Sequence, residues 1–490
     1  MAEYDFDIGV IGGGAAGLTV AAGAARLGAA TLLIEKEDVL GGDCLHYGCV
    51  PSKTLIRTAR AYHMLRRTEE LGLPPVEVPP VAWSGVRERV QSVIAAIQKH
   101  DSEERFCSLG VQVRFGSPSF RDDHSVRLGD ALHSARTWVV ATGSSPAVPP
   151  VEGLDRTAFL TNRDLFSLDR LPASMIILGA GPVAVEMAQA FNRLGTRVTV
   201  VQRSGQILSK EDRDMAEPVM DVLRQEGVGF VLNANVRRVR ESGGGREVLV
   251  RVGEEERTLR AETLLVALGR RPNVEDLGLD AAGVDLDVKG VRVDRRLRTS
   301  RKHIYAAGDV TGAYQFTHAA GYEGGVVISN ALFHLPRKTD YTFMPRCTYT
   351  DPEPAVMGMT EKEAEKEGID CSIWIEPFED NDRARAEGET RGRLKMILDE
   401  KEHPLGVQIL GPHAGDLLGE WAAVLNGGVK LSTLASAVHP YPTLGEINKQ
   451  VAGRFLSTKI FSEKVQKSLR FFFHLKGRAC GPLDRQGEKA

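Results

Sequence analysis

The sequence predicts an α/β protein in which two nucleotide-binding units precede a third domain of strands and helices. A unit made of a buried strand, a glycine turn, a helix and a second strand occurs near the amino terminus and returns about 170 residues later. After about residue 336, strands and helices follow one another without glycine turns. The length of 490 residues agrees with several domains, because single cores stop growing beyond about 250–300 residues.

The first unit carries a phosphate-binding turn. Its strand, helix and second strand are expected at 6–11, 15–27 and 31–34. Gly12, Gly14 and Gly17 form a G-x-G-x-x-G turn that lets a pyrophosphate reach the free N–H groups of the helix. Glu35 ends the second strand, where a carboxylate can accept hydrogen bonds from ribose hydroxyls. These features together indicate a dinucleotide site.

The second unit repeats this plan with one change. Its strand, helix and strand are expected at 175–178, 183–194 and 198–201, with Gly179, Gly181 and Ala184 in the turn. Gln202 and Arg203 stand where the first unit has its acid. Arginine attracts a 2′-phosphate, with Lys210 as a second positive charge, so we expect NADPH rather than NADH, with NADH still possible. The alternative is that Arg203 is a solvated surface residue.

The segments between these units are expected to be helical or proline-rich. Long helices are predicted at 52–67 and 86–109, a proline-rich linker at 74–80, and a domain boundary near residue 150. The net charge of −3 and the pI of about 6.5 give no general attraction for nucleic acid. Neither a signal peptide nor a membrane-spanning stretch is expected, and scattered cysteines favour the cytoplasm over a secreted disulfide framework.

Two cysteines stand out by their spacing. Cys44 and Cys49 are five residues apart, and Gly48 eases the distorted turn that a disulfide between them would need. Pro51 suits the early turns of a helix, and a thiol near a helix N-terminus has a lowered pKa. The pair is therefore expected to be redox-active; the alternatives are a structural disulfide or two buried thiols.

The segment from Gly41 to Lys53 resembles that of the flavoprotein disulfide reductases, which include dihydrolipoamide dehydrogenase, glutathione reductase and mercuric reductase. The resemblance runs from about Asp5 to about Phe461. Further matches are Ala141–Gly143, Ala267–Asn273, Ile304–Asp309 and Thr350–Glu353.

The resemblance implies an FAD- and NAD(P)H-dependent oxidoreductase with two Rossmann-like nucleotide-binding domains and an α+β dimerisation domain. The implied domains are FAD-binding at 1–150 and 276–335, NAD(P)H-binding at 151–275, dimerisation at 336–465, and a tail at 466–490. Cys49 would lie against the flavin, Cys44 would exchange with substrate, and Lys53 would pair with Glu186. The residues implied for FAD are Gly12, Gly14, Gly17, Glu35, Gly42, Lys53, Gly116, Thr142, Gly143, Gly308 and Asp309. Those implied for NADPH are Gly179, Gly181, Ala184, Arg203, Lys210 and Gly269.

The resemblance also implies a homodimer in which Tyr441 and Glu446 of the partner subunit complete each active site. In the lipoamide and glutathione enzymes a histidine stands five residues before the glutamate, whereas this chain has Tyr441, as mercuric reductase does. A phenol is a poor base at neutral pH. We therefore expect Hg(II) or another thiol-reactive substrate, with Cys44 and Cys49 as transient metal ligands. The alternative is a dihydrolipoamide dehydrogenase or another small-disulfide reductase.

Three features near the carboxyl terminus stay open. His439 and Tyr441 both precede proline, and on an extended chain they would point to the same face, so His439 is a candidate residual base. A single thiol, Cys480, stands where many mercuric reductases carry adjacent cysteines. Residues 471–473 are phenylalanines beside basic residues, which favours packing on the partner subunit over membrane binding. A non-catalytic role would leave Cys44 and Cys49 without purpose.

Overall fold

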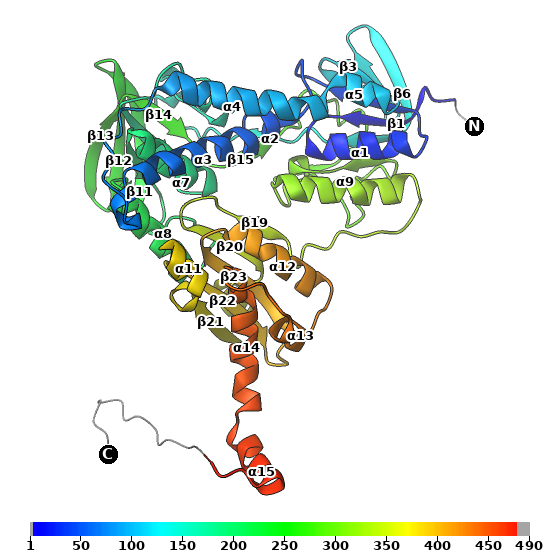
Figure 1. The fold of residues 1–490 in the computed structure, drawn as a ribbon. Coiled ribbons are helices and arrows are strands. Elements are labelled where there is room, and N and C mark those ends of the chain that lie inside the picture. Colours follow the sequence, from blue (N-terminus) through cyan, green and yellow to red (C-terminus); the bar gives the residue numbers. More distant parts are fainter. Residues whose placement is uncertain (1–2, 478–490) are drawn as a thin grey trace. The chain divides into compact units, whose positions relative to one another are not determined.

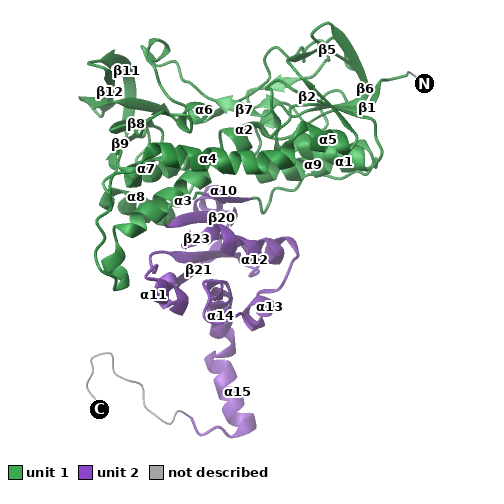
Figure 2. Ribbon diagram, turned by 45° about the horizontal axis from the view of Figure 1, so that its top comes forward, with its two compact units in different colours: residues 1–344, 348–351 green, residues 345–347, 352–490 purple. Residues whose placement is uncertain are grey.

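The computed structural model describes residues 3–477 and divides the chain into two compact units (Figures 1 and 2). The first unit comprises residues 1–344 and 348–351, and the second comprises residues 345–347 and 352–490. In the described part of the chain, no helix combines the length and the apolar character needed to cross a membrane.

A seven-stranded sheet forms the first layer of unit 1, in the order β3-β2-β1-β6-β5-β4 with β18 beside β6. Its strands are β1 (Phe6–Ile11), β2 (Thr31–Glu35), β3 (Val111–Phe115), β4 (Pro118–Phe120), β5 (Ser125–Leu128), β6 (Ala131–Val140) and β18 (Ile304–Ala306). β1 pairs in parallel with β2 and β6, and β18 in parallel with β6. Strand β18 therefore completes a sheet whose first strand, β1, lies near the amino terminus.

Two helices pack closely beside this sheet, as Figure 1 shows for α1 (Ala15–Arg26) and α9 (Thr317–Ala331). Small residues allow the close approach. A Cβ on Gly23 would lie 2.4 Å from Ile328, and a Cβ on Gly324 would lie 2.9 Å from Thr19. The apolar core between these helices and the sheet contains Val10, Val139 and Val326, all fully buried.

The second nucleotide-binding unit folds as its repeat predicts. A parallel sheet has the order β10-β9-β8-β14, made of β8 (Ser174–Leu178), β9 (Arg197–Val201), β10 (Gly229–Val231) and β14 (Thr263–Val266). Its helices are α7 (Pro182–Leu194) and α8 (Arg213–Gln225). An antiparallel sheet follows, made of β11 (Ala234–Ser242), β12 (Gly245–Val252) and β13 (Glu255–Ala261). β7 (Ser144–Pro146) and β15 (Arg270–Pro272) pair with each other.

The long helix expected at 86–109 is two helices, so that prediction is wrong. α4 (Trp83–Gln98) ends in a short 3-10 turn, and α5 (Glu103–Ser108) starts anew. Ser102 causes the break: its backbone is extended, with φ −80° and ψ 151°. Its hydroxyl also accepts a hydrogen bond from the N–H of Arg105 at 3.3 Å, as an N-cap does.

Unit 2 is built on a five-stranded antiparallel sheet in the order β19-β20-β23-β22-β21. The strands are β19 (Pro345–Cys347), β20 (Glu353–Gly358), β21 (Cys371–Pro377), β22 (Arg393–Asp399) and β23 (Pro404–Gly411). Its helices are α10 (Glu361–Glu367), α11 (Asp382–Glu387), α12 (Ala414–Asn426), α13 (Leu431–Ser436), α14 (Glu446–Ile460) and α15 (Glu463–Phe473). Trp421 and Phe378 are fully buried in this unit.

Candidate active site

The two cysteines lie at the junction of two helices. Cys44 belongs to α2 (Gly42–His46), and Cys49 is the first residue of α3 (Cys49–Leu65), three residues earlier than the helix predicted at 52–67. Gly48 joins them. A Cβ there would lie 2.9 Å from the Asp43 carbonyl oxygen and 3.2 Å from the Cys44 Cα, so only glycine fits this junction.

The surroundings of the two thiols shift their pKa values in opposite directions. A hydrogen bond from Cys44, assisted by Thr317 and by the charge of Lys53, lowers the pKa of Cys49 to about 6, although burial acts in the opposite direction. Thr317 Oγ1 lies 3.5 Å from Cys49 Sγ. The same hydrogen bond, reinforced by burial, raises the pKa of Cys44. Cys49 is therefore the thiol that ionises first, and Cys44 donates to it.

An ion pair follows one helical turn after Cys49. Lys53 Nζ lies 2.8 Å from Glu186 Oε2 on α7, as the resemblance implies, and Glu186 is only 4% exposed. The backbone N–H of Tyr349 donates to the other carboxylate oxygen at 2.9 Å. Lys53 also lies 4.4 Å from the centre of the Tyr349 ring. No sequence pattern predicts the contact with Tyr349, which lies about 300 positions from Lys53.

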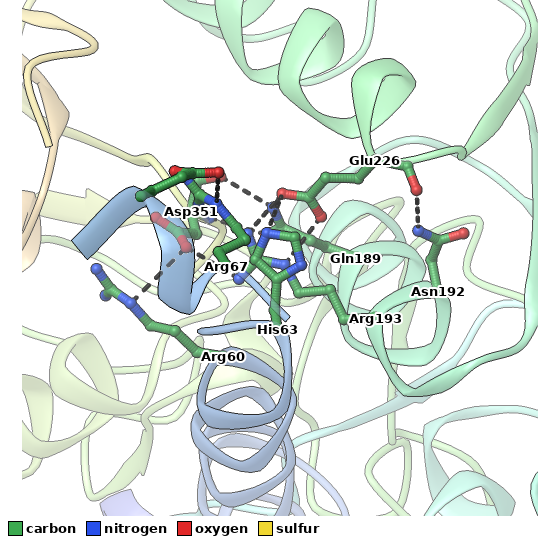
Figure 3. A network of polar contacts seen from close by, with 9 residues as sticks. Arg60, His63, Arg67, Gln189, Asn192, Arg193, Glu226 and Asp351 are labelled. Carbon is green, nitrogen blue, oxygen red and sulfur yellow. Dashed lines mark hydrogen bonds and ion pairs between the residues drawn. The ribbon is translucent and has the colours of Figure 1, made fainter. Parts of the chain in front are cut away.

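The same two helices carry a second polar network, shown in Figure 3. Arg193 of α7 has a side chain that is 4% exposed, and its guanidinium donates to Glu226 at 2.8 Å and to Asp351 at 2.9 Å. Gln189 exchanges hydrogen bonds with the backbone of Asp351, at 2.8 and 2.9 Å. Because a buried arginine is costly unless it is paired, these contacts fix residues 348–351 on α7.

Helix α3 contributes to this network from its own side. Arg60 lies 3.7 Å from Asp351, and His63 lies 3.9 Å from Glu226 (Figure 3). Burial, together with the nearby charge of Arg193, lowers the pKa of His63. The cysteine-bearing helix and α7 are thereby held together by charge as well as by packing.

The first glycine turn has the geometry that a pyrophosphate needs. Gly12 has φ +111°, and a Cβ there would lie 2.3 Å from the Ala141 carbonyl oxygen. A Cβ on Gly17 would lie 1.8 Å from the Gly12 carbonyl oxygen, and Gly14 is the N-cap of α1. Gly42 lies against this turn, since a Cβ on it would approach Gly14 Cα to 2.8 Å. Glycine at these positions therefore keeps Cβ atoms out of the turn, which the close approach of a pyrophosphate to the helix N-terminus requires.

Glu35 lies beside the same turn, and its carboxylate already accepts two hydrogen bonds from the backbone. It is 7% exposed, and its carboxylate accepts hydrogen bonds from the N–H of Gly13 at 2.6 Å and of Glu37 at 2.9 Å. Each carboxylate oxygen has a second lone pair for a ribose hydroxyl. Gly116, at φ +135°, lies beside the end of the same strand and donates its N–H to the Glu35 carbonyl oxygen at 2.8 Å.

The remaining residues assigned to FAD gather around Asp309. Ser144 Oγ donates to the Asp309 carboxylate at 2.5 Å, and burial raises the pKa of this acid. Gly308 donates its N–H to Glu323 at 2.6 Å. Thr142 donates its hydroxyl to the Asn273 carbonyl oxygen at 2.7 Å. Gly143, at φ +69°, accepts the Asn273 N–H at 2.9 Å.

The second glycine turn is similar in shape but open at its outer edge. Gly179 has φ +104°, a Cβ there would lie 2.4 Å from the Ala267 carbonyl oxygen, and Ala184 is fully buried. Gly181 has open space around its Cβ position. Arg203 and Lys210 are both exposed, and within residues 3–477 neither side chain forms an ion pair. Gly269 has φ +114° and lies two residues after Ala267.

The predicted site residues of unit 2 differ in exposure and in hydrogen-bond partners. Tyr441 is 71% exposed, and its hydroxyl donates to Asp382 at 2.9 Å, which raises the pKa of the phenol. Glu446 begins α14, and its carboxylate accepts the N–H of Thr443 at 3.4 Å. The side chain of His439 is only 12% exposed and lies 2.9 Å from Glu420. His439 and Tyr441 therefore differ in exposure and in partner, and the common face expected for them stays a prediction.

The tail is described only in part. Residues 463–473 form α15, and Phe471, Phe472 and Phe473 are 76%, 71% and 69% exposed. Cys480 lies outside the described residues.

Sequence reasoning missed the polar groups that surround the cysteines. Asp43 immediately precedes Cys44, and its carboxylate lies 2.9 Å from Arg270. Arg270 in turn donates to Ser144 Oγ at 2.6 Å. Both Asp43 and Arg270 lie inside motifs that the sequence singled out, yet nothing local to either predicts that they meet.

Comparisons with known proteins agree with this geometry. A family model described as pyridine nucleotide-disulphide oxidoreductase matches residues 6–324, and the dimerisation-domain model of that family matches residues 344–452. The chain is 32% identical to a mercuric reductase of Staphylococcus aureus over 467 residues, which cover 95% of this chain and 84% of that protein. It is 33% identical to a dihydrolipoyl dehydrogenase of Geobacillus stearothermophilus, covering 92% of this chain and 96% of that protein.

A solved structure is also similar. The HOCl-induced flavoprotein disulfide reductase RclA from Escherichia coli superposes with a TM-score of 0.82 at 28% identity, covering 91% of this chain and 99% of that one. A Cu(II) complex of the same protein superposes equally well.

Proposed function

Since the chain belongs to the pyridine nucleotide-disulphide oxidoreductase family, we propose that it is an NADPH-preferring FAD enzyme that reduces Hg(II) or another thiol-reactive substrate. Members of this family use FAD and a pyridine nucleotide. The finer assignment depends on Tyr441, an exposed phenol at the position where the disulfide-reducing relatives carry a histidine.

The first glycine turn and the Asp309 cluster supply the residues that would hold FAD. Gly12, Gly14 and Gly17 allow the tight turn that would bind the pyrophosphate, and Glu35 has lone pairs for the ribose hydroxyls. FAD, when bound, supplies two-electron transfer between the nicotinamide and the cysteines. The Lys53–Glu186 ion pair would place a positive charge beside the flavin ring.

The positive charges at the second glycine turn support a preference for NADPH over NADH. Arg203 and Lys210 are exposed at the outer edge of the second turn, where a 2′-phosphate would lie. An acid at this position would repel that phosphate, and the sequence has Gln202 instead.

The chemistry of the cysteines suits a soft metal ion. NADPH and a proton reduce the Cys44–Cys49 disulfide to two thiols and leave NADP⁺. Cys49 ionises at about pH 6, so at neutral pH one thiolate is ready and Cys44 can lose its proton as it binds the metal. In each later turnover, Hg(II) held by these sulfurs accepts two electrons that originate from NADPH and leaves as Hg(0), with release of NADP⁺ and one proton.

The match to the family's dimerisation-domain model at residues 344–452 supports an active site shared between two subunits. We propose a homodimer in which Tyr441 and Glu446 of the partner subunit lie beside each Cys44. The phenol pKa is raised by Asp382, so Tyr441 can donate a hydrogen bond but is a poor acceptor of protons near pH 7. A departing dithiol would lack its proton shuttle, whereas a bound metal ion needs none.

Two other acceptors have specific support. Dihydrolipoyl dehydrogenases match this chain as well as mercuric reductases do, so a small disulfide is the second candidate. A related structure contains Cu(II), a cation that thiolates also bind, so Cu(II) belongs in the same assay.

The decisive experiment compares acceptors with purified protein. NADPH oxidation is measured with Hg(II) in excess thiol, and with Cu(II), lipoamide and oxidised glutathione in the absence of added thiol, in wild type, Cys44→Ala and Cys107→Ala. Cys107 is an exposed cysteine in α5 and serves as the matched control. We expect Hg(II)-dependent turnover that disappears only in Cys44→Ala. Faster turnover of lipoamide or glutathione than of Hg(II) would refute the substrate assignment.

A reciprocal variant tests the role of Tyr441. Tyr441→His restores an imidazole where the disulfide-reducing relatives have one, so we expect lipoamide turnover to rise by about 10²-fold or more, which is the usual contribution of a general acid–base. Unchanged lipoamide turnover would show that Tyr441 does not determine the substrate.

A further inference from the structure

The hydroxyl group of Tyr441 has a single hydrogen, and a carboxylate accepts it. Tyr441 Oη donates to Asp382 Oδ2 at 2.9 Å. An ionised carboxylate only accepts hydrogen bonds, so the direction of this bond is fixed. The phenol oxygen then has only lone pairs for any further partner. Because Tyr441 is 71% exposed, a group outside unit 2 can contact it.

Asp382 is held beside Tyr441 through the residue that precedes it. Asp382 begins α11, and Asn381 is the N-cap of that helix. The fully buried Asn381 side chain accepts the N–H of Ala384 at 3.0 Å and donates to the Thr443 carbonyl oxygen at 3.2 Å. Two adjacent residues at the start of α11 therefore bind the segment that carries Tyr441.

The same segment is also bound to α14. The N–H of Thr443 donates to Glu446 at 3.4 Å, and its hydroxyl donates to the Pro440 carbonyl oxygen at 3.0 Å. The hydrogen bond to Asp382 and the charge of Asp382, with a smaller contribution from Glu446, raise the pKa of Tyr441. The phenol therefore keeps its hydrogen at neutral pH, and that hydrogen lies between Tyr441 and Asp382.

We propose that Asp382 is a positioning residue that determines specificity: it holds the hydroxyl hydrogen of Tyr441, so that this phenol presents an acceptor, and not a donor, to the cysteine pair of the partner subunit. This role rests on the proposed active site shared between two subunits. It does not depend on which metal ion is reduced there.

The commitment of this hydrogen affects the two classes of acceptor differently. A small disulfide is reduced with departure of a thiolate, which gains from a hydrogen-bond donor nearby. A phenol whose hydrogen is held by Asp382 offers none. A bound metal cation needs no donor, and a lone pair on oxygen does not oppose it. Asp382 therefore acts with Tyr441 against small disulfides.

A second aspartate nearby offers a matched control. Asp380 lies two positions before Asp382 and is 55% exposed, and its carboxylate lies 3.7 Å from Arg454. Asp380 is not among the groups that act on the Tyr441 phenol. Asp380→Ala and Asp382→Ala remove the same side chain and the same charge, so a difference between them reports on the contact with Tyr441.

The first test measures the reactivity of the phenol without any substrate. The full-length, FAD-loaded, oxidised protein is treated with tetranitromethane, which attacks the phenolate, and nitration of Tyr441 is followed by peptide mass spectrometry. We expect nitration about three- to tenfold faster in Asp382→Ala than in wild type, because the group that chiefly raises the pKa of the phenol is gone. Asp380→Ala should match wild type. Equal rates in the two variants would overturn the proposal.

The second test asks whether the freed hydroxyl serves a disulfide. NADPH-dependent lipoamide turnover is measured in Asp382→Ala, Tyr441→Phe and the double variant Asp382→Ala/Tyr441→Phe. We expect Asp382→Ala to raise turnover by about three- to tenfold, the factor that one hydrogen bond supplies. A gain of activity cannot come from a damaged fold. The double variant should show no gain over Tyr441→Phe, since no hydroxyl remains.

The outcomes separate this role from the proposed substrate. Lipoamide turnover that does not rise in Asp382→Ala, or that rises equally when Tyr441 is phenylalanine, would overturn the role of Asp382. If both tests give the expected result but Hg(II) turnover is absent from wild type, only the proposed substrate is refuted.

Discussion

The two glycine turns share a plan and differ in what stands at the end of the following strand. In the first turn, Glu35 is buried and bound to two backbone N–H groups. In the second, Arg203 is exposed, and within residues 3–477 its hydrogen bonding is limited to its backbone N–H, which donates to the Gln202 side chain at 3.2 Å. The same position in the two units therefore holds either a buried acid that hydrogen-bonds the backbone or an arginine that is exposed to solvent. In the proposed function, the buried Glu35 would support FAD, which stays bound, and the exposed Arg203 would contact NADPH, which binds and leaves in each turnover.

The largest expected effect comes from filling the first turn. In Gly17→Ala the new Cβ would lie 1.8 Å from the Gly12 carbonyl oxygen, so backbone must move, and we expect a loss of about 2–4 kcal/mol of stability together with most of the bound FAD. Gly181→Ala in the second turn meets open space and is the matched control. Thermal unfolding and flavin absorbance measure both variants, and equal losses would contradict the steric difference between the turns.

A smaller effect is expected from Glu35→Gln. The amide keeps the size of the carboxylate but turns N–H groups towards one of the two backbone donors, which costs about 1–3 kcal/mol. We expect FAD to be retained about tenfold less tightly, measured by flavin release on filtration. Glu37→Gln is the control, because Glu37 is half-exposed and its carboxylate contacts Arg163 at 3.3 Å. If both variants retain FAD equally, Glu35 is not an internal brace.

The smallest effect should come from Arg203→Ala, with the fold intact. Removing a charge-assisted contact to a 2′-phosphate should raise the KM for NADPH by about tenfold and leave the KM for NADH within about twofold. Steady-state oxidation of both nucleotides measures the difference. Arg213→Ala removes an exposed arginine that pairs with Glu217 on α8 and should change neither value. A parallel rise for NADPH and NADH would mean that Arg203 does not read the phosphate.

Much of this architecture could be predicted from local pattern. The glycine turns, their flanking strands and helices, and the cysteine spacing are each encoded within a few dozen residues, and their predicted bounds differ from the structure by only a few residues. The break between α4 and α5 was missed because it depends on a single N-cap, Ser102, inside a run that reads as helix.

The polar environment of the site could not be predicted in the same way. Arg270 meets Asp43 across more than 220 positions of sequence, and Tyr349 meets Lys53 across nearly 300. No periodicity encodes such pairs. His439 shows the same limit, because its ring lies 2.9 Å from Glu420 of α12, a contact that no local pattern encodes.

The contacts of Asp351 and Tyr349 bear on where this chain can be divided. Residues 345–347 join the sheet of unit 2, yet the next four residues return to unit 1 and supply partners to Glu186 and Arg193. A fragment ending at residue 344 would lose one of the anions that compensate a buried guanidinium and one hydrogen bond to the carboxylate that pairs with Lys53. Recombination or proteolytic cleavage at this junction would therefore remove contacts of Glu186 and Arg193, even though the apolar core of unit 1 is unchanged. The chain folds into two compact units, but a division between residues 344 and 348 would remove contacts that unit 1 needs.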